Sequence, residues 1–222
     1  MERRLKPIRS AGVDLAGSES RATGYCILGA DLNVETQVLF RNEEIIQRIQ
    51  RDRPGIVCVD APLALPKGRC CLRDDCSCRG KGHLRECDKG LLQMGIKFFP
   101  LTLGPMRKLT MRGMELKEAL KNLGFGVIES YPGAAQDLMG IPRKKSLEEL
   151  KKSLIRYGLK GGITGNLTDH ELDAVTCALV GRMYLEGNYL ALGDPEEVLM
   201  ILPNPASSTL RMKLPSRKPF SN

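Results

Sequence analysis

The strongest constraint on the fold is a pair of short apolar runs near the N-terminus, joined by a polar turn. The first run, residues 11–17, is interrupted by one acid, Asp14, and the second run spans residues 23–28. Two such runs with a polar turn between them predict a β-hairpin. A carboxylate within an apolar strand is costly to bury without a positive partner. Asp14 therefore indicates a metal ion, an Arg or Lys partner, or an exposed strand end; the alternative is an acid that merely starts the turn before Gly17.

The next segments extend this hairpin into a sheet. Residues 34–40 predict a third strand, and Asn42 can cap the helix that follows, whose isoleucines share one face. Residues 56–59 are a continuous apolar run, typical of a strand buried on both faces, and they end at Asp60. Three antiparallel strands, a helix and a buried parallel strand predict a mixed α/β sheet.

Two more acids interrupt apolar sequence further along the chain. Glu129 lies near the end of a predicted strand at residues 124–132. Asp173 lies about one turn into a predicted helix at residues 168–181, which opens with a capping box and is apolar nearly all round. His170, three residues earlier, shares the helix face of Asp173. Its apolar neighbours leave Asp173 without a structural role, so we expect it to resist ionisation in the absence of a cation.

These acids occupy element ends that the carboxyl edge of a sheet can gather. Clustered carboxylates repel one another unless divalent cations neutralise them, and Mg²⁺ or Mn²⁺ prefers such oxygen ligands. Two cations a few ångströms apart would hold the attacking and leaving oxygens of a phosphoryl transfer. The pattern thus indicates a carboxylate metal site; the alternative is a set of unrelated acids satisfied by arginine, backbone N–H groups or solvent.

Several short motifs occur in a fixed order between about residue 10 and residue 185. They are Gly12-Val-Asp-Leu-Ala-Gly17, Thr23-Gly-Tyr-Cys-Ile27, Val59-Asp-Ala-Pro62, Arg85-Glu-Cys-Asp88 before Gly95-Ile96, Glu129-Ser-Tyr-Pro132 and Asp169-His-Glu-Leu-Asp-Ala174. Together they resemble domain-of-unknown-function family 429, described as predicted nucleases of the RNase H fold. The resemblance implies three antiparallel strands with the fourth strand beside the first.

The same resemblance implies roles for individual residues. It implies that Asp14, Asp60 and Asp173 are the catalytic metal ligands for Mg²⁺ or Mn²⁺. His170-x-x-Asp173-Ala174 looks like the corresponding helix pattern of RuvC-type resolvases, so His170 would assist as a ligand or a proton-transfer group. Glu129 is a further catalytic candidate, but it lies outside the standard metal positions of RNase H enzymes. It would either orient substrate or pair with an arginine.

A cysteine-rich insertion is expected at residues 66–90, which are polar and poor in apolar residues. Six potential soft ligands lie within it: Cys70, Cys71, Cys76, Cys78, His83 and Cys87. In a reducing compartment such a cluster favours metal over disulfides, and four ligands suffice for structural Zn²⁺. Disulfides and plain reduced thiols are the alternatives, because the spacing lacks two clean Cys-x-x-Cys pairs. The remaining cysteines lie in apolar sequence and are expected to be core residues.

The net charge of +8 comes mainly from the two ends of the chain. Residues 1–10 contribute +3 and residues 203–222 contribute +4. Basic ends can bind nucleic acid, or they can simply keep a protein in solution. No stretch approaches the roughly 18 apolar residues of a membrane span, and the N-terminus lacks the apolar region of a secretory signal. We therefore expect a cytoplasmic protein without a membrane partner, for which nucleic acid is the expected partner.

The sequence predicts one RNase H-like domain at residues 10–202, with a five-stranded mixed sheet, flanking helices and the insertion at 66–90. Residues 203–222 are expected to form a basic, mobile tail. The favoured function is a divalent-metal-dependent nuclease. An actin- or sugar-kinase-like protein that binds nucleotide phosphates and a non-catalytic module that binds nucleic acid or protein are the alternatives. The sequence does not indicate the oligomeric state or distinguish DNA from RNA.

Overall fold

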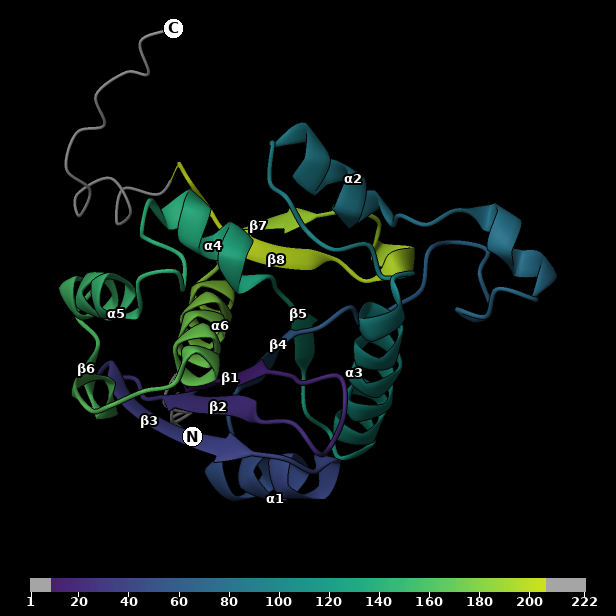
Figure 1. Ribbon diagram of the computed structural model, residues 1–222. Coiled ribbons are helices and arrows are strands. Elements are labelled where there is room, and N and C mark those ends of the chain that lie inside the picture. Colours follow the sequence, from purple (N-terminus) through teal and green to yellow (C-terminus); the bar gives the residue numbers. More distant parts are fainter. Residues whose placement is uncertain (1–8, 207–222) are drawn as a thin grey trace, which may run out of the picture.

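The computed structural model describes residues 9–206; residues 1–8 and 207–222, which carry most of the basic ends, lie outside the described residues. Within this range the chain forms an α/β fold around one eight-stranded sheet with the order β6-β3-β2-β1-β4-β5-β8-β7 (Figure 1). The strands are β1 (Ser10–Asp14), β2 (Thr23–Leu28), β3 (Asn33–Leu39), β4 (Ile56–Asp60), β5 (Val127–Glu129), β6 (Lys160–Gly161), β7 (Tyr189–Leu192) and β8 (Met200–Pro203). The predicted mixed α/β class is confirmed.

The centre of the sheet has the arrangement that the sequence predicted. Strand β2 pairs antiparallel with both β1 and β3. Strand β4 then pairs parallel with the other side of β1, and β5 pairs parallel with β4. The apolar run of β4 is fully buried except at its last residue, Asp60, which is partly exposed. A strand covered on both faces needs such a continuous run, so its burial follows from its sequence, and its position beside β1 is the one that the resemblance implied.

The predicted number of five strands is wrong, because three short strands extend the sheet at its edges. Strand β6 adds two residues beside β3. At the other edge, β7 and β8 form an antiparallel pair, and β8 joins β5 through the single register pair Glu129 and Met200. These strands are too short to show a period of their own. Pairing with the existing sheet, rather than local sequence, therefore makes them strands.

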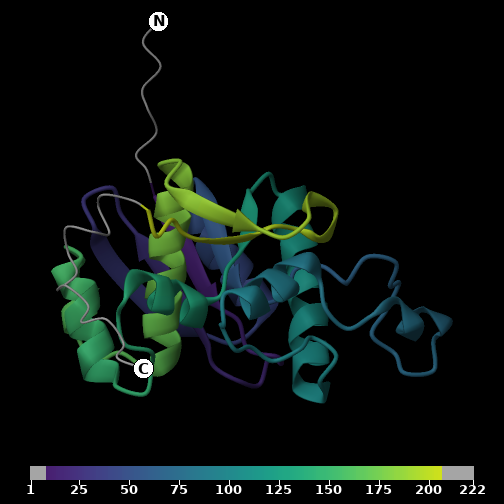
Figure 2. The ribbon, with the colours of Figure 1, turned by 90° about the horizontal axis from the view of Figure 1, so that it is seen from above.

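Helices cover both faces of the sheet (Figure 1, Figure 2). They are α1 (Asn42–Asp52), α2 (Glu86–Gln93), α3 (Gly104–Asn122), α4 (Pro132–Met139), α5 (Leu147–Arg156) and α6 (Asp169–Leu185). One apolar cluster joins α4, α5 and α6 to the sheet, and a second joins α1 and α3 to it. The N-cap of α1 is Arg41 rather than the expected Asn42, whose side chain instead accepts a hydrogen bond from Arg112 (2.9 Å). No helix within residues 9–206 combines the length and apolar character needed to cross a membrane.

Two glycines allow α6 to lie unusually close to the sheet. A Cβ atom on Gly12 of β1 would stand 1.9 Å from the carbonyl oxygen of Ala174, and one on Gly24 of β2 would stand 2.0 Å from that of His170. Such distances are far inside van der Waals contact, so only glycine fits at either strand position. The close approach brings the first turns of α6 over the carboxyl end of β1.

The cysteine-rich segment projects from the body of the protein beside α3 (Figure 1, Figure 2). Its one regular element is a 3₁₀ turn at Ser77–Lys81. The carboxylate of Glu197 accepts backbone N–H bonds from Lys67 and Glu86 (2.6 Å each) and so holds both ends of the segment together. Helix α2 begins at Glu86, so the predicted range 66–90 includes its start. The buried residues of α2 pack with β8 and α4 in a third apolar cluster.

Candidate functional site

Asp14 and Asp60 lie side by side at the ends of neighbouring strands. They are register partners in the parallel pairing of β1 with β4. Side chains of register partners in adjacent strands point to the same face of the sheet. Asp14 is buried and Asp60 is partly exposed. The sheet itself therefore brings these two carboxyl groups together.

Helix α6 adds two side chains to this pair. His170 Nδ1 lies 2.7 Å from Asp14 Oδ2. Asp173, one turn further along the helix, is buried, and its pKa responds to the charge of Asp14. The chain thus brings together Asp14, Asp60, Asp173 and His170, the four residues that the sequence singled out from β1, β4 and α6.

Asp173 also has two partners that the sequence did not reveal. Gln136 of α4 donates from Nε2 to Asp173 Oδ1 (2.9 Å). The ammonium group of Lys144, in the connection between α4 and α5, lies 3.1 Å from Asp173 Oδ2 and 3.9 Å from Asp169 Oδ2. The expectation that Asp173 lacks structural partners is therefore wrong, because tertiary packing supplies a cation and an amide.

The pKa values of the cluster reflect crowded negative charge. Burial, followed by the charges of Asp14 and Asp173, holds the pKa of Asp60 well above its usual range. Burial and the charge of Asp14 also raise the pKa of Asp173, although Lys144 and Gln136 oppose this shift. The hydrogen bond to Asp14 raises the pKa of His170, since it stabilises the imidazolium form. The cluster thus resists full ionisation in the absence of an added cation.

Glu129 belongs to a different, fully buried network. The guanidinium group of Arg85 forms two bonds of 2.7 Å to the carboxylate of Glu129 and a third of 3.1 Å to Asp88. Glu129 also accepts a backbone bond from Leu63 (2.8 Å). Of the two roles expected for Glu129, pairing with an arginine is the one that its contacts show. Bidentate geometry of this kind is the strongest form of such a pair.

A cavity of about 260 Å³ lies between this buried network and the acid cluster. Asp60 and Lys144 line it on the side of the acids, and Arg85, Asp88 and Glu129 line it on the other. Its walls are mainly apolar and aromatic, and they include Phe98, Phe99, Tyr131, Met106 and Leu109. The cavity therefore adjoins the acid cluster at Asp60 and Lys144.

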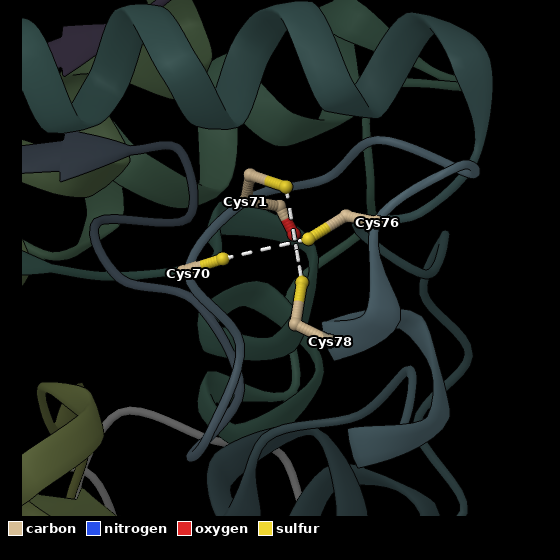
Figure 3. A group of neighbouring side chains, drawn as sticks. All are labelled: Cys70, Cys71, Cys76 and Cys78. Carbon is tan, nitrogen blue, oxygen red and sulfur yellow. Dashed lines mark hydrogen bonds between the residues drawn. The ribbon is translucent and has the colours of Figure 1, made fainter.

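Four cysteines of the projecting segment point toward one another (Figure 3). The sulfur atoms of Cys70, Cys71, Cys76 and Cys78 all lie within 4.8 Å of one another. The Sγ–Sγ distance is 3.6 Å between Cys70 and Cys76 and 3.8 Å between Cys71 and Cys78. Hydrogen bonds among the thiols raise the pKa of Cys70 to about 12, and the bond with Cys78 contributes most. Hydrogen bonds lower the pKa of Cys78 to about 6, and the bond from the backbone of Cys70 contributes most.

Two of the six predicted soft ligands do not join this group. Cys87 lies in α2 and is buried in the third apolar cluster, where burial raises the pKa of its thiol. His83 is exposed and is not part of the four-cysteine group. The predicted ligand set therefore shrinks to four thiols, because the last turn of the segment leads Cys87 into the core of the fold.

The two clusters suit different metals. Four thiols form the soft, closed set that Zn²⁺ takes in structural sites. The acid cluster offers hard carboxylate oxygens at the edge of a cavity, which suits Mg²⁺ or Mn²⁺ with water in the remaining positions. Among residues 9–206, the four cysteines meet the criterion that three or more potential ligand atoms all lie within 4.8 Å of one another, and the acids do not. The acids are thus more widely spaced than a closed cage, and Lys144 stands beside Asp173.

Comparison with known proteins gives little further identification. No protein-family model matches the chain, and no curated protein matches it. The structure of RuvC from Thermus thermophilus is similar over 81% of this chain and 96% of its own, with 13% sequence identity and a TM-score of 0.46. The resemblance to family 429 remains an expectation, and the functional interpretation rests on the geometry of the site.

Lys144 and Gln136 are the site residues that the sequence did not predict. Lys144 is one of three consecutive basic residues, so nothing in the sequence separates it from its solvated neighbours. Gln136 had a weaker signal, because it is one of two polar residues on a short apolar helix and, unlike its exposed neighbour Asp137, it is buried. A buried amide of this kind needs a polar partner, and Asp173 is that partner.

Proposed function

We propose that this protein is a divalent-metal-dependent nuclease that hydrolyses phosphodiester bonds at the acid cluster. The observation that carries the proposal is the convergence of Asp14, Asp60 and Asp173 from three separate elements, with His170 bonded to Asp14. Buried acids gathered without a full set of counter-charges are unfavourable for stability, so such an arrangement is typical of a functional site. A bound Mg²⁺ or Mn²⁺ would supply charge neutralisation of the phosphate and activation of water.

The residues of the chain have distinct roles in this proposal. Asp14, Asp60 and Asp173 hold the metal, and Gln136 orients the Asp173 carboxylate by donating to Oδ1. His170, held by Asp14, supplies a proton donor or acceptor at the edge of the cluster. Lys144 supplies a positive charge on the side of the cavity, where it can contact a phosphate group. Nucleic acid is the proposed substrate because it carries phosphodiesters, and DNA and RNA are both to be tested.

The experiment compares cleavage of labelled single-stranded, double-stranded and branched DNA, and of RNA, with Mn²⁺, with Mg²⁺ and with EDTA. Cleavage that requires the metal and is lost in Asp60→Asn and Asp14→Asn would support the proposal. Asp31→Asn is the matched control, since Asp31 is exposed in the turn between β2 and β3. Binding of nucleic acid that persists in EDTA without any cleavage would favour the non-catalytic module instead.

We also propose that Cys70, Cys71, Cys76 and Cys78 hold a structural Zn²⁺. Four sulfur atoms at about 2.3 Å from a central zinc in tetrahedral geometry are about 3.8 Å apart. The sulfur–sulfur distances of 3.6 Å between Cys70 and Cys76 and 3.8 Å between Cys71 and Cys78 agree with that value. They are much longer than the roughly 2.05 Å of a disulfide. A four-thiolate set leaves no open position for substrate, so this metal would stabilise the segment rather than act in catalysis.

Elemental analysis of the purified protein tests the zinc proposal, with one Zn²⁺ per chain expected. The double variant Cys70→Ser/Cys76→Ser should lose the metal, whereas Cys26→Ala, a change in the buried strand β2, should keep it. The intact mass of the denatured protein distinguishes the alternatives, because each disulfide lowers it by two hydrogens. Absence of zinc would refute the proposal, whether the thiols are oxidised or free.

A further inference from the structure

The cavity beside the acid cluster contains a polar group without a partner. Ser130, between β5 and α4, lines the cavity and is only 2% exposed. Its backbone N–H is bonded to the carbonyl of Val59, which fixes the residue in place. Its hydroxyl has no hydrogen-bond partner among residues 9–206. A buried hydroxyl of this kind is unfavourable when it is unpaired, so the cavity is suited to a ligand that carries a polar atom at this point.

The other walls define the shape of that ligand. Phe98, Phe99 and Tyr131 give the cavity aromatic sides, and Phe99 is 74% exposed at its mouth. The volume of about 260 Å³ corresponds to about nine waters at roughly 30 Å³ each, which is room for one planar ring system. Aromatic side chains stack on such rings whatever the identity of the base.

The charged groups at one end of the cavity define what the ring is attached to. Asp60 and the half-exposed ammonium group of Lys144 line that end, next to the acid cluster. The ammonium group of Lys144 attracts an anionic group to this end of the cavity, and a metal bound by the acids would do the same. A ligand that fills the whole region therefore has an aromatic ring with polar edges at one end and a phosphate at the other.

We infer that the cavity binds a nucleobase of the substrate next to the phosphate held at the acid cluster. This inference rests on the proposed function, because that function supplies the phosphate. The base lies against Phe98 and Phe99, and one of its polar edge atoms bonds to the hydroxyl of Ser130. Arg85, Glu129 and Asp88 are mutually paired, so they form a fixed, buried wall of the cavity.

Calorimetric titration of the full chain with AMP and with ribose 5-phosphate, both with Mn²⁺ present, tests the inference. AMP should bind at least about ten-fold more tightly, since only AMP carries a base. Phe99→Ala should weaken AMP binding by between about five-fold and a hundred-fold, as removal of a stacking aromatic does. Ser130→Ala should weaken it by about two-fold to ten-fold, as loss of one hydrogen bond does. Neither variant should affect ribose 5-phosphate.

The variants are suited to this test because neither is expected to disturb folding. Phe99 is exposed, and the Ser130 hydroxyl has no partner to lose within the described chain. Phe40→Ala is the matched control, since Phe40 is another exposed phenylalanine, located after β3. Equal affinities for AMP and ribose 5-phosphate would overturn the inference. So would AMP binding that is unchanged in both Phe99→Ala and Ser130→Ala.

Two further measurements show whether the base belongs to a nucleic acid or to a free nucleotide, and whether the cavity inference or the nuclease proposal fails. A single-stranded hexadeoxyadenylate that binds more tightly than AMP assigns the cavity to a base of nucleic acid, whereas equal binding assigns it to a free nucleotide. Base-selective binding in a protein that cleaves no nucleic acid supports the cavity inference and refutes the nuclease. Metal-dependent cleavage without base-selective binding supports the nuclease and refutes the cavity inference.

Discussion

Replacement of Asp60 by asparagine should stabilise the metal-free protein. Asp14 and Asp60 are register partners on adjacent strands, whose backbones lie about 5 Å apart, and the two carboxyl groups interact directly. Two unit negative charges at that distance repel by about 3 kcal/mol at an effective dielectric constant of about 20. Proton uptake by Asp60 and the nearby positive groups, Lys144 and His170, relieve part of this repulsion. We therefore expect Asp60→Asn to raise the free energy of unfolding by about 1–2 kcal/mol in EDTA.

For a chain of this size, that gain corresponds to a rise in melting temperature of about 2–8 °C. The assay is thermal unfolding in EDTA and with Mn²⁺, which should stabilise the wild-type protein more than Asp60→Asn. Asp31→Asn controls for the substitution itself, because exposed Asp31 follows the end of β2 that lies away from Asp14; it pairs with Lys160 (3.3 Å), so this variant should be no more stable than the wild type. A lower melting temperature of Asp60→Asn in EDTA, with its response to Mn²⁺ intact, would show that repulsion between Asp14 and Asp60 does not destabilise the metal-free protein. Asp60 would then be a structural acid.

The dependence on pH provides a second readout of the same prediction. The folded-state pKa of Asp60 is raised above its ordinary value of 3.8. Its contribution to stability is therefore fully present below that pH and is lost as the pH rises through the folded-state pKa. The raised pKa of His170 acts in the same direction, with its contribution present below 6.5 and lost above it. The metal-free protein should be more stable at pH 5 than at pH 8, and Asp60→Asn should flatten the acidic part of this dependence.

Three other substitutions test contacts on which the site depends. Glu129→Gln should lower the free energy of unfolding in urea by about 3–5 kcal/mol, because it leaves the buried guanidinium group of Arg85 with Asp88 as its remaining carboxylate partner. Gly12→Ala should lower the free energy of unfolding by about 1–3 kcal/mol or more, because its Cβ would meet the backbone of α6. The same shift of α6 should weaken the Mn²⁺-induced rise in melting temperature. Wild-type stability in either variant would contradict these contacts. Lys144→Met should tighten Mn²⁺ binding by up to about five-fold in calorimetry, since the half-exposed ammonium group competes for Asp173; weaker binding would show that Lys144 does not oppose the metal.

The strands and helices with strong local patterns were predictable from sequence. The strands β1, β2 and β4 are short apolar runs bounded by turn residues, and α6 is a long apolar segment that opens with a capping box, so length and flanking residues distinguish strand from helix. The acids Asp14, Asp60 and Asp173 stood out because each interrupts such a run. The convergence of Asp14 and Asp60 follows from strand order, since the ends of parallel neighbours meet at one edge of a sheet, whereas Asp173 joins them because α6 packs closely on β1.

The short edge strands, by contrast, depend on the assembled fold. Strands β6, β7 and β8 have from two to four residues, and they exist because an edge of the sheet offers unpaired backbone groups. Likewise, the sequence could not divide the soft ligands between the four-thiol cluster and the core. The direction of the chain at the start of α2 makes that division.

Local pattern alone identifies which acids interrupt buried strands and helices, because burial and periodicity are local properties of a strand or helix. Tertiary structure alone decided the partners of those acids. Lys144 reaches Asp173 from a connecting segment, and Arg85 reaches Glu129 across 44 positions of the chain. Such pairings depend on distances between elements that no local pattern encodes. They nevertheless set the charge of the acid cluster and the shape of the cavity beside it.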